Sequence, residues 1–168
     1  MPGDQMWKGD SVQIGIDPHS AQAGSEGAQI PFELGFSVPP AGKIFAYAWS
    51  GNIDFSTTIL RGERSATGWR ISAEIPWRSI LLDPASLPES FGVNVVVNSG
   101  DGQGRREVLQ WTAGLADRND SREFARVHLV PGGKETLSFL RVAKNSFDRK
   151  DVIEGRFVTY NLKPTDRK

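Results

Sequence analysis

The sequence predicts an all-β protein, an antiparallel β-sandwich of the jelly-roll or immunoglobulin-like kind. The clearest sign is a period of two over residues 30–38, where apolar side chains take every second position, as in a half-buried strand. A second sign is the segment 92–112, in which a valine-rich run, a turn of glycine and aspartate, and another apolar run follow one another. No segment long enough for three helical turns shows a helical period. The 18 glycines and 10 prolines, spread along the chain, suit short strands joined by turns.

The elements can be placed in order along the chain. The first strand covers 11–16, where apolar residues alternate with polar or small ones until Asp17 and Pro18 end the run. Small polar residues over 19–29 indicate a loop, and 30–38 forms the second strand. The later elements are strands over 44–49, 56–61 and 69–75, one helical turn over 77–82, and strands over 91–98, 107–112 and 124–130.

The alternating positions also predict the core. In an antiparallel sandwich, the apolar positions of each strand face inward and pack between the two sheets. The residues expected there are Ile30, Phe32, Leu34, Phe36, Trp69, Ile71, Val93, Val95 and Trp111.

A change in composition at Pro131-Gly132-Gly133 divides the chain. Residues 1–133 are expected to form the sandwich, and 134–168 to supply additional strands or the start of a following β domain. Two strand-like runs, 135–143 and 152–162, lie in this tail. Because so short a piece cannot bury a core of its own, we expect it either to pack on the main domain or to be part of a domain whose remainder is missing.

The bulk charge excludes some partners. Lys plus Arg and Asp plus Glu both number 20, so the net charge is zero. Such a chain has no long-range attraction to phosphate backbones, and nucleic acid is not expected as a partner. No apolar run approaches the roughly 20 residues of a membrane span, and the first residues lack the apolar stretch of a signal peptide. The absence of cysteine excludes disulfides and thiolate metal sites.

Several patterns that could carry chemistry lack the groups they would need. The glycine-rich segment 100–105 leads into a strand, whereas a phosphate loop leads into a helix. Residues 9–12 resemble the nucleophile block of one serine-esterase family, but no Asp-x-x-His follows to supply a base. His19 and His128 are isolated, and two histidines alone do not make a zinc site. We therefore predict that the chain is not an enzyme.

Two further sets of side chains with oxygen atoms could carry chemistry, one as catalytic carboxylates and one as calcium ligands. Glu33, Glu74 and Glu107 lie on predicted strands, but a glycosidase would need two carboxylates facing each other about 5–10 Å apart, and nothing in the pattern favours such a pair. Asn98 and Asp101 could offer oxygens to calcium, which takes six to eight of them. A plain turn is the favoured interpretation of that segment. We expect no cofactor, with calcium the one ion that the pattern leaves open.

Trp7 stands out among the five tryptophans because it precedes its strand in polar surroundings. An exposed indole ring can stack on the C–H face of a sugar, while amides and guanidinium groups near it bind the hydroxyls. Equally, Trp7 could close the end of the sandwich as a hydrophobic plug, since single surface aromatics are common. The pattern leaves both interpretations open.

One series of segments follows a fixed order: Trp7–Ile14, Gly68-Trp69, Ala73–Trp77, Phe91–Asn98, Leu109–Trp111 and Phe124–Val130. This ordered series resembles the family 9 carbohydrate-binding modules and their DOMON-like relatives, over roughly residues 6–131. It is much more specific than any one of its segments. The resemblance implies a β-sandwich that binds sugars without catalysis, usually as an accessory domain of a secreted enzyme that degrades polysaccharides.

The resemblance also suggests site residues. Sugar-binding members hold a sugar end between two tryptophans, assisted by Glu, Gln and Arg side chains. The first tryptophan matches Trp7, and the second falls near Arg118. The Glu falls at Gln13, the Gln at Val96 and the Arg near Pro31, so the clasp itself is not expected to persist. The predicted carbohydrate-binding residues are Trp7, as stacking platform, and Gln13, Asn98 and Arg118.

We consider three functions. The first is binding of a glycan or polysaccharide by an accessory domain, with neighbouring domains of an extracellular or periplasmic parent protein as partners. The second is a structural sandwich that supports other domains and has no ligand. The third is a haem-binding domain of the DOMON type, which would need axial ligands from Met1, Met6 or the two histidines.

The family pattern begins with strands that this chain does not contain. A sheet without them has a bare edge, and bare edges pair with other strands. We expect residues 135–162 to fill the gap rather than a second copy of the chain in a homo-oligomer, because a tethered strand needs no association entropy. Deleting 134–168 should therefore cause aggregation or unfolding, measured by light scattering and thermal melting. A deletion variant that stays monomeric and equally stable would show that the tail belongs to another domain.

Overall fold

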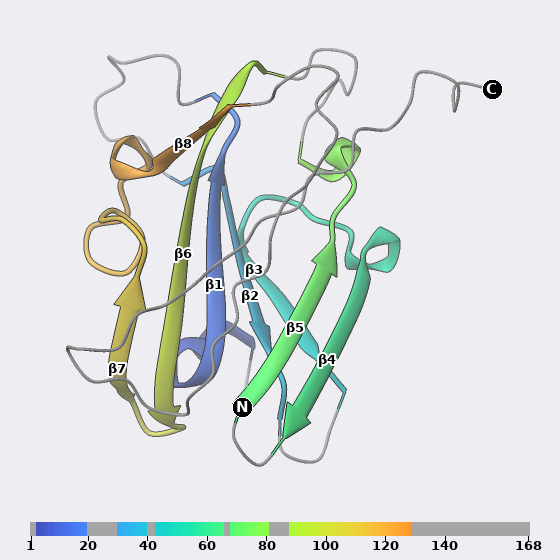
Figure 1. The fold of residues 1–168 in the computed structure, drawn as a ribbon, viewed down its shortest axis with the longest axis vertical. Coiled ribbons are helices and arrows are strands. Elements are labelled where there is room, and N and C mark those ends of the chain that lie inside the picture. Colours follow the sequence, from blue (N-terminus) through green and yellow to red (C-terminus); the bar gives the residue numbers. More distant parts are fainter. Residues whose placement is uncertain (1–2, 20–29, 40–42, 66–67, 81–87, 129–168) are drawn as a thin grey trace.

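The computed structural model describes residues 3–19, 30–39, 43–65, 68–80 and 88–128. These residues form β-strands and short 3-10 helices but no α-helix, which confirms the predicted all-β sandwich (Figure 1). The strands are β1 (Gly9–Asp17), β2 (Phe32–Ser37), β3 (Phe45–Ser50), β4 (Ile59–Ser65), β5 (Gly68–Glu74), β6 (Ser90–Asp101), β7 (Arg105–Gln110) and β8 (Ala125–His128). The 3-10 helices are η1 (Gly3–Lys8), η2 (Phe55–Thr57), η3 (Trp77–Ser79) and η4 (Ser121–Glu123).

The predicted strands before residue 129 are present with shifted ends. The strand expected over 56–61 begins only at Ile59, because η2 takes the preceding residues. Asp54 caps η2, and its side chain accepts a hydrogen bond from the backbone N–H of Ser56 at 2.9 Å. The helical turn expected at 77–82 is η3. The strands expected at 135–143 and 152–162, and the tail 134–168, lie outside the described residues.

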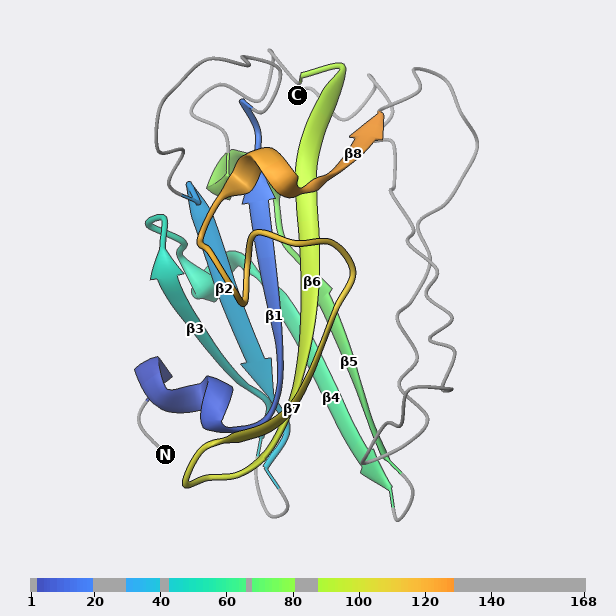
Figure 2. The same cartoon turned by 90° about the vertical axis from the view of Figure 1, so that its left-hand side faces the viewer.

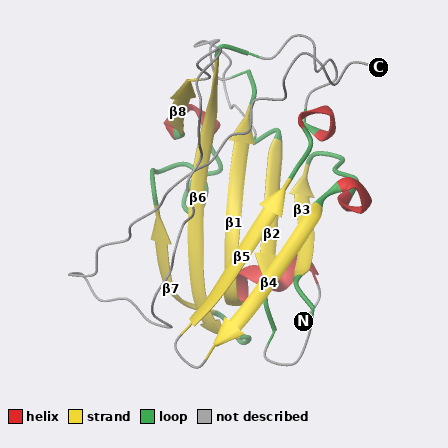
Figure 3. Cartoon of the chain, turned by 45° about the vertical axis from the view of Figure 1, so that its right-hand side comes forward, coloured by secondary structure: helices red, strands yellow, loops and turns green. Residues whose placement is uncertain are grey.

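The strands form two antiparallel sheets. The larger has the order β3-β2-β1-β6-β7, and β8 also pairs with β6. Strand β6 is 12 residues long; its first part, Ser90–Val93, pairs with β8 and a later part, Val96–Gly100, pairs with β7. The smaller sheet is the β4–β5 hairpin, which crosses the larger sheet obliquely (Figure 3).

The main core lies between the larger sheet and the hairpin. Leu34 and Phe36 of β2 are fully buried there, and Ile71 and Ala73 of β5 pack against them from the hairpin. Most of the core prediction is confirmed, because Leu34, Phe36, Val93 and Val95 are buried while Phe32, Trp69 and Ile71 are partly buried against them.

A second, smaller core lies on the opposite face of the larger sheet, which we call the outer face. It consists of Ile30, Val96, Leu115 and Phe124. The segment 111–124 folds over this face and covers part of β6 (Figure 2). Ile30 is therefore buried as predicted, but on the outer face and not between the sheets.

The prediction for Trp111 was wrong, because its side chain is 52% exposed. Leu109, two residues earlier, packs against buried valines of the core. Trp111 instead follows the last residue of β7, and β7 stands at an edge of the sheet. Its backbone N–H still donates to the oxygen of Val95 at 2.9 Å. The alternation of apolar residues thus continues past the end of β7, but the core no longer covers the side chain at residue 111.

Two phenylalanines on neighbouring strands provide a test of this packing. Phe36 is 0% exposed and Phe45 is 43% exposed. Phe36→Ala should lower the free energy of unfolding by about 3–5 kcal/mol, the usual cost of removing a buried phenyl ring. Phe45→Ala should cost less than about 1 kcal/mol, because half-exposed positions tolerate change. Urea denaturation followed by tryptophan fluorescence measures both, and equal losses would contradict the assigned core.

Candidate functional site

Polar side chains of three adjacent strands meet on the outer face. Gln13 of β1 lies at the centre: its Nε2 donates to Oε1 of Glu33 in β2 at 3.0 Å. Its Oε1 accepts from Nδ2 of Asn98 in β6 at 2.9 Å. Gln13 and Asn98 are 5% and 1% exposed, whereas Glu33 is half-buried. A buried amide is thus held between a carboxylate and a second amide.

Arg105, the first residue of β7, adds a guanidinium group. Its Nη2 donates to Gln13 Oε1 at 3.1 Å, and its Cζ lies 5.4 Å from the centroid of the Trp7 ring. Nζ of Lys8 lies at 5.4 Å from the same ring. Both distances are those of a cation–π contact. Trp7 comes from η1, directly before β1. We call Trp7, Gln13, Glu33, Asn98 and Arg105 the Gln13 cluster.

A shift of register brings Arg105 to the outer face. In the pairing of β6 with β7, Ser99 lies opposite Glu107. The next residue, Gly100, lies opposite Arg105, so that Arg106 is skipped. Because successive residues of a strand point to opposite faces, a shift of one residue moves the following side chain to the other face. Arg105 therefore points to the side on which Gln13 lies.

Burial shifts the pKa values of the two charged members of the cluster. It raises the pKa of Glu33 above the ordinary 4.5, while the hydrogen bond from Gln13 and the charge of Arg105 offset part of that rise. Burial also lowers the pKa of Arg105, against the effect of the Glu33 carboxylate, although a guanidinium remains charged in proteins. Glu33, whose carboxyl group is harder to ionise than usual, therefore lies near the permanently charged guanidinium group of Arg105.

Two buried polar atoms of the cluster are unsatisfied. Within the described part of the chain, Oδ1 of Asn98 and Nε of Arg105 have no hydrogen-bond partner. Buried polar atoms without a partner cost free energy and are uncommon. The described residues therefore leave one acceptor and one donor of the cluster without a partner.

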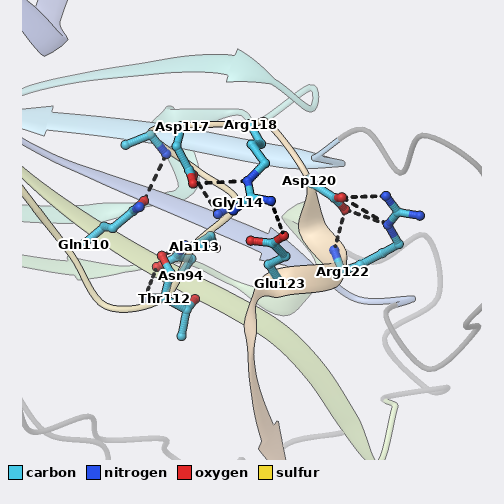
Figure 4. Close-up of polar contacts among 11 residues, drawn as sticks. Asn94, Gln110, Thr112, Ala113, Gly114, Asp117, Arg118, Asp120, Arg122 and Glu123 are labelled. Carbon is cyan, nitrogen blue, oxygen red and sulfur yellow. Dashed lines mark hydrogen bonds and ion pairs between the residues drawn. The ribbon is translucent and has the colours of Figure 1, made fainter.

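Three of the four predicted carbohydrate-binding residues, Trp7, Gln13 and Asn98, come together in this cluster. The fourth, Arg118, lies in the segment 111–124 and pairs with neighbours there (Figure 4). Its Nε is 3.4 Å from Oδ2 of Asp117, and its Nη1 is 3.2 Å from Oε1 of Glu123.

The buried Asn94 of β6 holds the start of the segment 111–124. Its Nδ2 donates to two backbone oxygens of that segment at 2.7 and 2.8 Å, and its Oδ1 accepts a backbone N–H at 3.1 Å (Figure 4). The segment that carries Arg118 thus serves to cover the outer face.

The sequence prediction considered Glu33 only as a glycosidase carboxylate and did not include Arg105 among the sugar-binding residues. Glu33 occupies a polar position in the alternation of 30–38, so pairing the first two strands would have placed it beside Gln13. No such signal exists for Arg105. Regular alternation from Val108, which lies opposite Asn98, would have placed Arg105 on the inner face.

The residues considered for calcium have different partners. Asp101 accepts a backbone N–H within its turn at 3.0 Å and a hydrogen bond from Nη2 of Arg106 at 2.6 Å, and these contacts lower its pKa. Asn98 belongs to the Gln13 cluster. Among the described residues, no group of three or more His, Cys, Asp or Glu side chains is placed to hold a metal ion.

The described candidates for an axial haem ligand, Met6 and His19, take no part in the hydrogen bonds of the Gln13 cluster. Met6 is 4% exposed, and its sulfur packs beside Gly35 in β2. His19 is exposed, and its backbone N–H donates to Oδ1 of Asp17 at 2.9 Å. Met1 and the side chain of His128 lie outside the described residues.

Comparisons with known proteins found no matching family model, no matching curated protein and no matching solved structure. The resemblance to the family 9 carbohydrate-binding modules therefore stays a prediction. In the described part of the chain, no helix is both long enough and apolar enough to cross a membrane.

The raised pKa of Glu33 predicts a particular dependence of stability on pH. Between the ordinary value of 4.5 and the raised folded value, the folded state binds more protons than the unfolded state. The contribution of Glu33 to stability must then fall as the pH rises through that window. Glu33→Gln removes this term, so the variant should gain stability relative to the wild type between pH 4 and neutral pH. Thermal melting across that range measures the difference; a constant difference would contradict the desolvated carboxylate.

Proposed function

We propose that this chain binds carbohydrate, without catalysis, through the Gln13 cluster. The observation that carries the proposal is the convergence of an indole, a carboxylate, a guanidinium group and two amides on one face of the sheet. A sugar ring offers an apolar C–H face for the indole. Its hydroxyls donate and accept hydrogen bonds at once, which suits a carboxylate beside a guanidinium.

Exposure divides the cluster into two layers. Trp7, Glu33 and Arg105 are half-buried and reach solvent, whereas Gln13 and Asn98 lie behind them. In this proposal Trp7 is the stacking platform, Glu33 accepts from one hydroxyl and Arg105 donates to another. Gln13 positions both charged groups through its own hydrogen bonds. Groups fixed before binding lose little entropy when the ligand arrives.

The buried hydroxyl of Ser11 supports a binding function over a hydrolytic one. Ser11 is 0% exposed, and its Oγ donates to the backbone oxygen of Gly9 at 3.3 Å. The same Oγ accepts from Nδ2 of Asn98 at 3.2 Å. It therefore helps to hold the frame of the cluster. Together with the family resemblance, this favours an accessory role in an extracellular or periplasmic protein that acts on polysaccharides.

The proposal is tested by affinity electrophoresis of the full chain in gels that contain different polysaccharides. Trp7→Ala should reduce retention, because stacking on an aromatic ring is worth about 1–3 kcal/mol by analogy with nucleic-acid bases, or about five- to 150-fold in Kd. Arg105→Gln should act in the same direction. Melting temperatures of both variants should stay close to that of the wild type.

Trp111→Ala is the matched control, since it removes an exposed indole outside the cluster. It should leave retention unchanged. Wild-type chain that binds no glycan would overturn the proposal in favour of a structural sandwich. A loss of stability in Trp7→Ala that equals its loss of retention would identify Trp7 as a hydrophobic plug.

A further inference from the structure

A separate pocket of about 510 Å³ opens at one end of the sandwich. It lies where β1 and β3 begin and where β2, β4 and β6 end, at the lower end of the molecule in Figure 1. This volume falls in the range of small-molecule sites. Its lining includes four apolar residues, Met6, Val38, Pro39 and Phe45.

Two carboxylates that line the pocket are already paired. Asp10 forms an ion pair with Arg64, with Oδ2 3.2 Å from Nη2. The other guanidinium nitrogen of Arg64, Nη1, donates to the backbone oxygen of Val38 at 2.8 Å. Asp101 is paired with Arg106, whose Nη2 lies 2.6 Å from Oδ2. Neither carboxylate is therefore free to hold a cation in the pocket.

Lys43 differs from these charged groups. No carboxylate of the described residues pairs with it, although it lines the same pocket. Phe45, the first residue of β3, follows two residues later and lines the same pocket. Its ring is 43% exposed, which is unusual for a phenylalanine. The pocket is thus lined by an ammonium group that no described carboxylate pairs with and by an exposed aromatic side chain.

We propose that this pocket binds a small organic anion in which a carboxylate is carried on a ring. The ring packs against the exposed side chain of Phe45, and the carboxylate contacts the ammonium group of Lys43. The Gln13 cluster offers different chemistry, because it contributes its own carboxylate, Glu33, and a tryptophan platform. No residue that lines the pocket belongs to the Gln13 cluster, although Met6 precedes Trp7 and Gly100 pairs with Arg105. We treat the end pocket as a second site.

The test is isothermal titration of the full chain with two carboxylate probes, sodium glucuronate and sodium benzoate. Glucuronate represents a sugar acid and benzoate an aromatic acid. The probe that binds more strongly shows which of these two classes of carboxylate the pocket prefers. The neutral counterparts, glucose and benzyl alcohol, should bind at least about threefold more weakly to the pocket, because they lack the charge-assisted contact. Binding of the anion should also weaken as salt is added. If neither anion binds, or if each neutral probe binds as well as its anion, the proposal is wrong.

Lys43→Gln should weaken binding of the preferred anion by about three- to tenfold, the range for a charged contact at a partly exposed position. Arg78→Gln, which removes an exposed cation from η3 beyond the opposite end of β5, should have no effect. Phe45→Ala should also weaken binding, and thermal melting confirms that the variant folds. Unchanged affinity in both pocket variants would overturn the proposal.

Trp7→Ala separates the two sites. It should leave anion binding intact even if it abolishes retention on polysaccharide gels. A simultaneous loss of both in a folded Trp7→Ala variant would show that the end pocket is not a separate site.

Discussion

Strand β6 is buried on both faces, since every residue from Phe91 to Asn98 is removed from solvent. Valines supply its inner face, but the outward positions include two asparagines, Asn94 and Asn98, that must find partners because a buried amide is costly when unpaired. Asn94 is satisfied by the backbone of the segment 111–124. The amide nitrogen of Asn98 donates to Ser11 and Gln13, while its Oδ1 has no partner among the described residues. One strand thus fixes both the cover of the outer face and the frame of the candidate site.

Two glycines set the limits of that site. A side chain at Gly15 of β1 would overlap the ring of Phe124, and a side chain at Gly35 of β2 would overlap the ring of Trp49. Apolar rings therefore lie close against the sheet on either side of the Gln13 cluster. Their presence removes water from the surroundings of Glu33, which agrees with the rise in its pKa. The same two rings therefore both pack the outer face and shape the electrostatic surroundings of the cluster.

The sequence predicted the strands well because a half-buried strand imposes a period of two, which residues 30–38 follow closely. The same period misplaced Trp111, because it does not reveal where a strand leaves the cover of the opposite sheet. In the site, Glu33 and Arg105 were not predicted as sugar-binding residues because both depend on pairing between strands. Arg118 was proposed from its position in a family pattern, and its segment serves to cover the sheet.

The shift of register at Gly100 is the backbone feature on which the candidate site depends most directly. A side chain there would overlap the backbone oxygen of Lys8, and the N–H of Gly102 donates to that same oxygen at 3.0 Å. The end of η1 is thereby fixed to the turn between β6 and β7. This contact places Trp7 beside Arg105, while the shifted register turns Arg105 toward the outer face. Residues nearly a hundred positions apart are joined by backbone contacts and not by a sequence motif, so the cluster exists only once the sheet has formed.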